Sequence, residues 1–499
     1  MRNTLKIVPI LSCLFAGLFG TAIAPAAAQD AAAIKNSAIF DQLLAKTGVY
    51  DRSKTGKTPD FVSDPTWPQP LPHSWLLGQI GGLYVDSHDQ VWVYNRPRTL
   101  NNDEVGLEKA VPGATDAKGQ PINGLGFVRV DGFGADCCRA APSVLAFDAA
   151  GKLLHAWGGP ADPGFVGSKC KAEDGCIWPN IEHGIYIDQK DNVWIAGNSG
   201  APDAKEIPWT TNKSGGDGFI LKFDRDGNFK MRIGGTPPGP DSNNKDGGMN
   251  GTPLLYRPAD MVVDPKTNRL YVADGYGNRR ILIVDADTGK YIGHFGAYGN
   301  NPIDDAAAAA AGAWPQASAK GEKKPAFFRN PVHCVKIADD GKIYVCDRGN
   351  DRIQVFDGND ATLGKACSNP NGDAGKCGFV TERLISENTL TQPVLPGTAV
   401  SMNFSPDKAQ SCLYVGDNTN QTIYILNRDN LEQLGRLGRA GRMAGDFHWL
   451  HQVSLDSKGN IYTAEVDTGK RIQKFLRYGA DGCNGKGSAV VGGEAAENK

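Results

Sequence analysis

Short alternations of apolar and polar residues recur in pairs along most of the chain. Each pair consists of two period-two runs joined by a polar turn, such as residues 82–86 and 90–94, and this pattern predicts a β-hairpin. Such hairpins begin near residues 82, 184, 260, 334, 401 and 453. Most continue into a third run, a turn and a fourth run, such as residues 290–295. Repeated four-stranded units with many glycines in the turns predict an all-β fold, a six-bladed β-propeller over residues 75–483.

Long loop insertions interrupt this repeat at residues 98–142, 199–216, 236–256, 298–328 and 358–378. Loops of this length are either functional covers or irregular surface, and the sequence does not separate the two. We expect 98–142 to be a lid, because it directly follows a candidate site residue. Residues 29–74 form an N-terminal extension that we expect to supply a ring-closing strand. Residues 484–499 have almost no large apolar side chain, which predicts a disordered tail.

The first residues have the pattern of an export signal. Arg2 and Lys6 precede a mostly apolar run over residues 7–24, and three alanines at 26–28 are typical of a cleavage site. We therefore expect residues 1–28 to be a cleaved signal peptide and the product to be periplasmic or extracellular. No later run is long and apolar enough to span a membrane. A formal net charge of -2 without a basic run argues against a nucleic-acid partner.

The cysteines fit an oxidising compartment, because Cys13 lies in the signal and the remaining ten are an even number. One pair follows from register: the turn at residues 339–341 centres on residue 340 and places Cys334 directly opposite Cys346.

Three further pairings are less constrained by the sequence. Cys170 with Cys176, and Cys367 with Cys377, would close short loops. The adjacent Cys137 and Cys138 are either a redox or metal pair or, as we expect, members of separate bridges to partners such as Cys412 or Cys483.

Three of the eight histidines share one register. His183, His333 and His451 each stand ten residues before the apolar pair that starts a second strand. In a propeller the first strand of each blade lines the central channel, and alternate blades of a six-fold ring are about 120° apart. The three imidazoles should therefore converge on the axis, where three protein ligands and an open position are typical of catalytic zinc. The alternative is three separate channel-lining histidines, which the shared register disfavours. His448 is a competing ligand without a counterpart in other blades.

Three more polar residues should lie around this site, because the second strand returns to the face where the first begins. Arg96 and Arg348 each stand four residues after the aromatic residue of a second strand, and Tyr276 stands five after Tyr271. Each arginine alone is equally well explained as a solvated loop cation or, for Arg348, as a turn ion pair with the adjacent aspartate. Together the three residues predict a cationic pocket for a small-molecule or peptide substrate with a carboxylate, and a phenolate base.

Segments 183–188, 272–281 and 333–356 carry a resemblance to a known family. They resemble the NHL-repeat propeller of peptidyl-α-hydroxyglycine α-amidating lyase, and the resemblance extends over about residues 75–476. It implies an NHL-type propeller in which three histidines bind zinc, a tyrosine is the base and two arginines complete the site. The matching residues are His183, His333, His451, Tyr276, Arg96 and Arg348.

The resemblance also implies a structural calcium ion, held by the backbone carbonyls of Leu83 and Ile185 and by an aspartate after the last histidine. This chain has Gln452 at that place, a neutral amide that still offers an oxygen. The cysteine that follows the catalytic tyrosine in the family is Gly277 here, so that disulfide is absent.

The implied reaction is zinc-dependent cleavage of the N–C bond of an α-hydroxy-N-acyl amino acid, which gives an amide and a glyoxylate-like keto acid. Two alternatives remain open at this point. A metal-dependent propeller hydrolase or lactonase would use the same metal to activate water. Known propeller lactonases favour carboxylate and amide ligands for calcium, so a three-histidine set disfavours this alternative. A non-enzymatic NHL interaction scaffold would bind no zinc.

Overall fold

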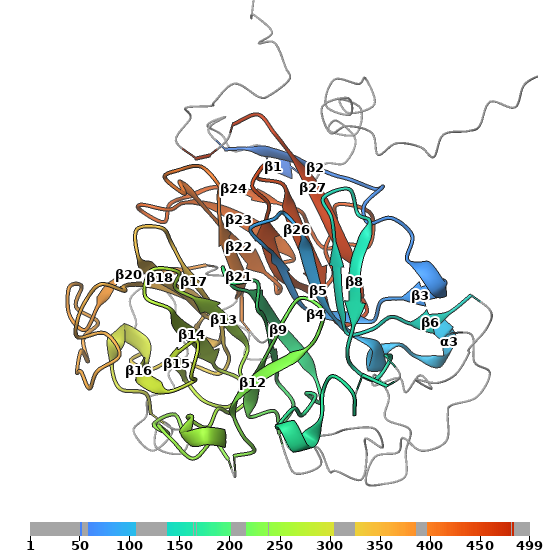
Figure 1. Ribbon diagram of the computed structural model, residues 1–499. Coiled ribbons are helices and arrows are strands. Elements are labelled where there is room, and N and C mark those ends of the chain that lie inside the picture. The colour runs from blue at the N-terminus through green and yellow to red at the C-terminus, as the bar shows by residue number, and fades with distance from the viewer. Residues whose placement is uncertain are drawn as a thin grey trace, which may run out of the picture.

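The computed structural model describes residues 50–51, 58–105, 137–162, 164–165, 167–200, 216–237, 239–303, 325–385, 397–480 and 482–483. The expected signal peptide at 1–28, most of the expected lid and the expected tail at 484–499 lie outside these ranges. Six antiparallel blades surround a central axis, which confirms the six-bladed β-propeller predicted from the hairpin repeat (Figure 1).

The first strand of every blade lies at the axis, and the six first strands contact one another in sequence around the ring. They are β4 (Gln79–Val85), β9 (Glu182–Ile187), β13 (Asp260–Val263), β17 (Val332–Ile337), β21 (Ala399–Phe404) and β25 (Leu450–Leu455). The second strands are β5 (Val91–Arg96), β10 (Val193–Gly197), β14 (Arg269–Asp274), β18 (Lys342–Asp347), β22 (Cys412–Asp417) and β26 (Ile461–Glu465). Because each pair is antiparallel, the second strand ends at the face where the first begins.

Two more strands complete each blade. The third strands are β7 (Val144–Phe147), β11 (Phe219–Phe223), β15 (Arg280–Asp285), β19 (Arg352–Asp357), β23 (Thr422–Asn427) and β27 (Ile472–Tyr478). The outer strands are β8 (Leu153–Trp157), β12 (Phe229–Gly234), β16 (Tyr291–Phe295), β20 (Phe379–Leu384), β24 (Gln433–Leu437) and β2 (Asp60–Ser63). Short pieces outside this scheme are β1 (Tyr50–Asp51), β3 (Trp75–Leu76), β6 (Arg139–Ala140) and α3 (Asn102–Val105).

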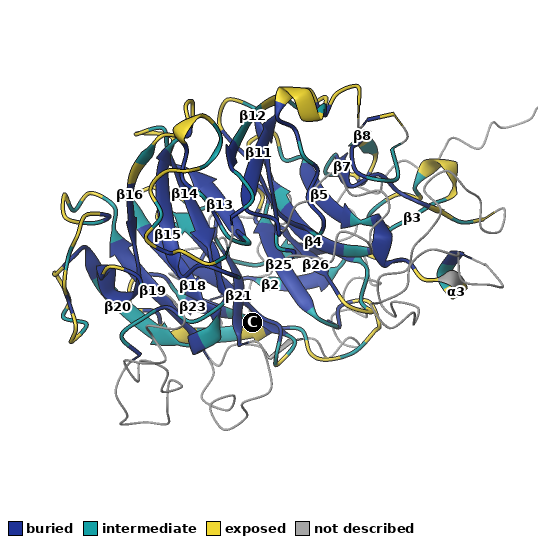
Figure 2. Ribbon diagram, turned by 90° about the horizontal axis from the view of Figure 1, so that it is seen from below, coloured by how far each residue is buried: buried dark blue, intermediate teal, exposed yellow. Residues whose placement is uncertain are grey.

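The core lies between neighbouring blades, where apolar side chains of successive sheets pack together. Each second strand buries an aromatic residue near its start: Trp92, Trp194, Tyr271, Tyr344, Tyr414 and Tyr462. In blades one and two the indole Nε1 donates at 2.9 Å to the aspartate that directly follows the first strand, Asp86 or Asp188. A buried indole thereby meets its hydrogen-bonding requirement while its ring fills the interface. Figure 2 shows the same arrangement, with buried strands and exposed connecting loops.

The last blade is built from distant parts of the chain. Its outer strand β2 lies within the expected N-terminal extension and pairs antiparallel with β27 (Figure 1). The short β1 likewise adds to β24 in blade five. Pairing of an early strand with late ones fixes the ring, because the blades then cannot separate without breaking a ladder.

The disulfides largely follow the expectation from sequence. Cys334 and Cys346 are opposite one another and bonded, as the hairpin register predicts. The two short-loop pairs are also confirmed, Cys170 with Cys176 and Cys367 with Cys377. The expectation of separate bridges for Cys137 and Cys138 is wrong, because these neighbours bond to each other and Cys412 bonds Cys483 across 71 residues. Disulfides in this number indicate an oxidising compartment.

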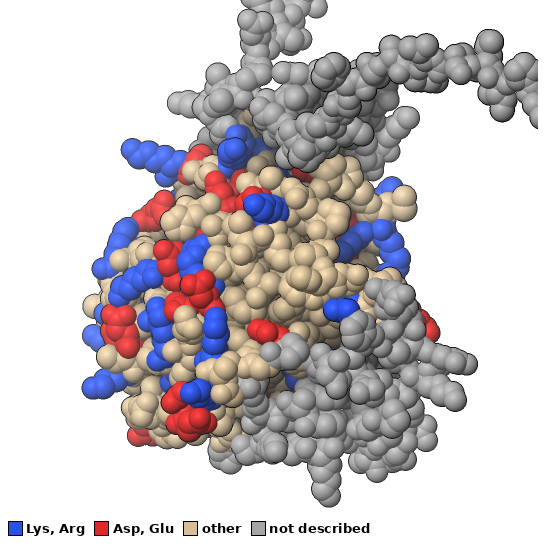
Figure 3. All heavy atoms as spheres, turned by 45° about the vertical axis from the view of Figure 1, so that its right-hand side comes forward, with Lys and Arg blue, Asp and Glu red and all other residues tan. Residues whose placement is uncertain are grey.

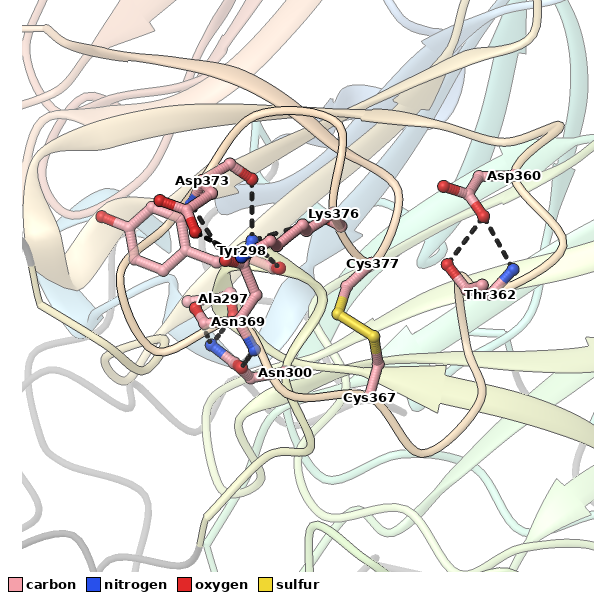
Figure 4. The surroundings of a disulfide bond; sticks show 10 residues. All are labelled: Ala297, Tyr298, Asn300, Asp360, Thr362, Cys367, Asn369, Asp373, Lys376 and Cys377. Carbon is pink, nitrogen blue, oxygen red and sulfur yellow. Dashed lines mark hydrogen bonds and ion pairs between the residues drawn. A yellow bond between two sulfur atoms is a disulfide. The ribbon is translucent and has the colours of Figure 1, made fainter.

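The insertion at 358–378 is an ordered part of the fold (Figure 4). The Cys367–Cys377 disulfide closes it, and Asn369 exchanges hydrogen bonds with blade three: its Nδ2 donates to the Tyr298 carbonyl at 3.3 Å and its carbonyl accepts from Asn300 Nδ2 at 3.1 Å. This segment therefore links blades three and four through hydrogen bonds.

The described start of the 98–142 insertion is anchored to two other blades. Arg98 forms an ion pair of 2.9 Å with Glu182 of blade two, and Lys470 of blade six lies 2.6 Å from Glu104 in α3. Its residues 106–136 lie outside the described ranges, so the lid stays a prediction.

On the face drawn in Figure 3, acidic and basic side chains are interspersed. Within the described ranges, no helix combines the length and apolar character that a membrane crossing requires.

Replacing both Cys334 and Cys346 with alanine is expected to lower the free energy of unfolding by roughly 2–3 kcal/mol, the usual effect of a short disulfide loop. Because His333 adjoins Cys334, metal retention should also weaken. Urea denaturation and metal analysis test this, with the Cys367→Ala/Cys377→Ala protein as a control that loses similar stability but no metal. Free thiols at both positions in non-reducing peptide mass spectrometry of the wild type would refute the pairing.

Candidate metal centre

The three histidines of the shared register meet at the axis. His183, His333 and His451 lie near the start of β9, β17 and β25, and all three side chains are buried. Their ring centroids form a nearly equilateral triangle with sides of 5.0, 4.8 and 4.9 Å. The ligand nitrogens all lie within 4.8 Å of one another, so the group could bind one metal ion. The histidines of alternate blades thus meet at one depth along the central axis, as the repeat predicts.

Backbone carbonyls of the neighbouring blades orient these rings. His183 Nδ1 lies 2.8 Å from the carbonyl oxygen of Ala259, and His333 Nδ1 lies 2.5 Å from that of Val400. A carbonyl can only accept, so Nδ1 carries the proton and the Nε2 lone pair remains for a metal. Ala259 and Val400 occupy the histidine position of the following blade, so the repeat supplies both acceptors. For His451 the equivalent acceptor is the carbonyl of Gly81 in blade one, although this contact falls outside strict hydrogen-bonding geometry.

Electrostatics keep the imidazoles neutral. Burial lowers the pKa of His183, His333 and His451 well below the usual range, and the positive charges of Arg96 and Arg348 act in the same direction on His183 and His451. For His333, Arg348 is the strongest charged neighbour that lowers the pKa. A neutral imidazole is the form that binds a metal. The donor set therefore fits a divalent ion without competition from protons near neutral pH.

Tyr276 lies against the triad. Its hydroxyl is 3.2 Å from His183 Nε2, 2.9 Å from His333 Nε2 and 3.2 Å from Arg348 Nη1. The tyrosine follows β14 in a turn that begins at Gly275, where a Cβ atom would collide with the backbone of Val332 in the next blade. Glycine at this position therefore lets the turn approach the axis closely enough for the phenol to reach the histidines.

Arg96 and Arg348 flank the triad from blades one and four. Arg96 donates to the carbonyl of Glu182 and, at 3.0 Å, to Gln79 Oε1, and Arg348 Nε donates to the Gly397 carbonyl at 3.4 Å. The alternative of a turn ion pair for Arg348 is wrong, because Asp347 instead pairs with Arg352 at 2.7 Å.

His448 is separate from the triad. Its Nε2 lies 3.3 Å from Asp467 and 2.9 Å from the Thr468 hydroxyl, both in an exposed turn. The structure thus brings together all six side chains predicted for the site and leaves this competitor outside.

Two polar residues near the site escaped the sequence analysis. The Arg257 guanidinium carbon lies 5.6 Å from the Tyr276 ring centroid, and its charge also acts on His183. No repeat register marks it, because it precedes a first strand. Asn418 stands four residues after Tyr414, the register of Arg96 and Arg348, so the repeat could have found it. Both polar atoms of its buried amide lack a partner among the described residues.

The implied calcium site stays a prediction. Leu83 and Ile185 are buried on the adjoining strands β4 and β9, as carbonyl ligands near the axis would require. The Gln452 Oε1 atom accepts a hydrogen bond of 3.0 Å from the Ser401 hydroxyl, so its oxygen already has one donor.

Comparison with known proteins agrees with the NHL-repeat propeller fold. The NHL repeat family matches residues 332–356, which include His333 and Arg348. Peptidyl-glycine alpha-amidating monooxygenase B of Xenopus laevis is 24% identical over 262 residues, covering 49% of this chain and 25% of that protein. The chain is an NHL-repeat propeller related to this enzyme at low identity. The mouse (Mus musculus) enzyme is 21% identical over 295 residues, or 59% of this chain and 23% of its own length.

The propeller also resembles a protein named only for its repeats. NHL repeat-containing protein 3 of Mus musculus is 26% identical over 239 residues, 47% of this chain and 49% of that protein. The chain thus spans about a quarter of the length of the amidating relatives and about half of this one. Among solved structures, a streptogramin B lyase has a TM-score of 0.41 at 11% identity, covering 85% of this chain and 100% of that chain. Virginiamycin B lyase from Staphylococcus aureus has a TM-score of 0.36 at 12% identity, covering 83% and 88%.

Proposed function

We propose that this propeller is a zinc-dependent carbon–nitrogen lyase that cleaves an α-hydroxy-N-acyl amino acid into an amide and a glyoxylate-like keto acid. The observation that carries the proposal is the position of the Tyr276 hydroxyl, within 3.2 Å of two histidine Nε2 atoms and of Arg348 Nη1. A potential base, a metal-ligand set and an anion-binding group thus surround one point.

The donor set favours zinc. Three neutral imidazoles with an open fourth position are typical of catalytic zinc sites. When bound, zinc supplies a Lewis acid that lowers the pKa of a substrate hydroxyl beside it. The related amidating enzymes supply a precedent for the reaction, although at low identity and over part of their length.

The residues around the triad bind the substrate carboxylate and transfer the proton. Arg348 and Arg96 have no carboxylate partner among the described residues, so one guanidinium is available for the substrate carboxylate. Arg348 stabilises Tyr276 as the phenolate, which takes the proton of the substrate hydroxyl and becomes neutral. The electron pair of the O–H bond forms the carbonyl group of the keto acid, and the C–N bond breaks with its electron pair passing to nitrogen. The amide nitrogen takes up the proton from the Tyr276 hydroxyl, which restores the phenolate. Atoms therefore balance without water.

Product analysis with α-hydroxyhippurate tests this function. A lyase gives benzamide and glyoxylate in equal amounts, at a rate above that of the reaction without protein. An amide hydrolase gives benzoate instead. Benzoate as the main product would favour the hydrolase alternative. No product above the background would favour the interaction scaffold and would contradict the lyase.

A further inference from the structure

The site carries more positive charge than the proposed reaction requires. Arg96, Arg257 and Arg348 all act electrostatically on His183. In contrast, two buried arginines elsewhere contact carboxylates: Arg280 lies 3.0 Å from Asp274, and Arg352 lies 2.7 Å from Asp347. None of the three site arginines has such a contact within the part of the chain that the structure describes.

The backbone holds Arg257 in a conformation that a non-glycine residue seldom adopts, with a φ of 61°. Its N–H donates to the Asp217 carbonyl at 2.8 Å, and its carbonyl accepts from the Tyr276 N–H at 3.1 Å. Left-handed backbone at such a residue is frequently associated with a functional site. The second of these hydrogen bonds joins Arg257 directly to the turn that carries the tyrosine.

The side chain of Arg257 is anchored at one end and open at the other. Its Nε donates to the Asn198 carbonyl at 2.7 Å, and the guanidinium lies over the Tyr276 ring. Its terminal nitrogens have no partner among the described residues, so their N–H groups can bind a carboxylate in the two-pronged geometry that arginine favours. Arg257 is half-buried, which leaves it reachable by a substrate.

One carboxylate and one phenolate leave an excess of positive charge beside three guanidiniums and a divalent metal, and a second carboxylate reduces that excess. We infer that Arg257 binds a second carboxylate of the substrate, so that the proposed lyase acts on dicarboxylates. The reaction in this inference rests on the proposed function, but the anion-binding role of Arg257 does not. Arg257 is then a specificity-determining residue, while the histidines and Tyr276 provide the reaction chemistry.

Calorimetric titration of the zinc-loaded protein with malate and with lactate tests the binding role. These 2-hydroxy acids differ in whether the β-carbon carries a second carboxylate. We expect the wild type to bind malate at least about tenfold more tightly than lactate, since a charged pair of hydrogen bonds is lost with lactate. Arg257→Gln should reduce this ratio to near one, mainly by weakening malate.

The matched control is Arg383→Gln, on the outer strand β20, which should leave the ratio and the zinc content unchanged. Equal affinities of the wild type for the two acids, failure of both to bind at millimolar concentration, or a ratio that survives Arg257→Gln would each overturn the inference. Zinc content is measured for every variant, so that loss of metal is not mistaken for loss of the anion contact.

Turnover separates this inference from the proposed reaction. With 4-carboxybenzoyl-α-hydroxyglycine, kcat/KM should exceed that for α-hydroxyhippurate, and Arg257→Gln should remove the difference. If neither compound yields an amide but malate binding depends on Arg257, the lyase fails and the anion site stands. If both compounds react equally well in the wild type and in Arg257→Gln, the lyase stands and the second-carboxylate inference fails.

Discussion

Tyr276→Phe is expected to lower kcat on α-hydroxyhippurate by about 10²-fold or more, the usual contribution of a positioned acid or base. Phenylalanine keeps the ring beneath Arg257 but removes the oxygen that lies 2.9 Å from His333 Nε2. Zinc content and Tm should therefore change little. Steady-state kinetics, metal analysis and thermal unfolding on the same preparation measure all three quantities.

Tyr298→Phe is the matched control. The Tyr298 hydroxyl also lies in a polar network, 3.0 Å from Glu382, but in the contact between blades three and four and not at the axis. Its loss should cost about 1–2 kcal/mol of stability and leave kcat near the wild-type value. Near-normal kcat in Tyr276→Phe would exclude the phenol as base and favour a metal-dependent hydrolase.

His333→Ala is expected to lose most of the bound zinc, because two imidazoles and water replace a three-nitrogen set. His294→Ala is the control: His294 is also buried, but its Nδ1 contacts the Tyr291 hydroxyl at 3.0 Å and it lies outside the triad. Both variants should keep the β-rich circular dichroism spectrum of the wild type, and only His333→Ala should lose metal and turnover. Unchanged zinc content in His333→Ala would contradict the triad as the metal site.

Much of the fold and site is predictable because the chain repeats. Equivalent positions in a propeller are brought to equivalent places around the axis, so register alone places His183, His333 and His451 together. The same logic explains Arg96, Arg348 and the Cys334–Cys346 pair, since each depends on one hairpin.

Features that do not follow the repeat escaped prediction. Arg257 lies before a first strand, and its direction depends on a left-handed backbone conformation that no residue pattern announces. The bond between Cys137 and Cys138 lies in an insertion, while Cys412 meets Cys483 through the path of the C-terminal segment. Both disulfides depend on the tertiary path of the chain, and the spacing of cysteines in the sequence does not give their pairing.

Asn418 is different, because it shares the repeat register of Arg96 and Arg348. An uncharged amide in this register has many structural roles, and only its burial without a partner among the described residues distinguishes Asn418.

Zinc titration of the metal-free protein, followed by glyoxylate release from α-hydroxyhippurate, tests the metal-dependent lyase most directly. Activity should be absent after chelation, rise in proportion to added zinc and level off at about one ion per chain, as one three-histidine site requires. The His333→Ala protein should stay inactive throughout the same titration. Full glyoxylate release in the chelated wild type, or no release at any zinc level, would contradict a lyase centred on the three histidines.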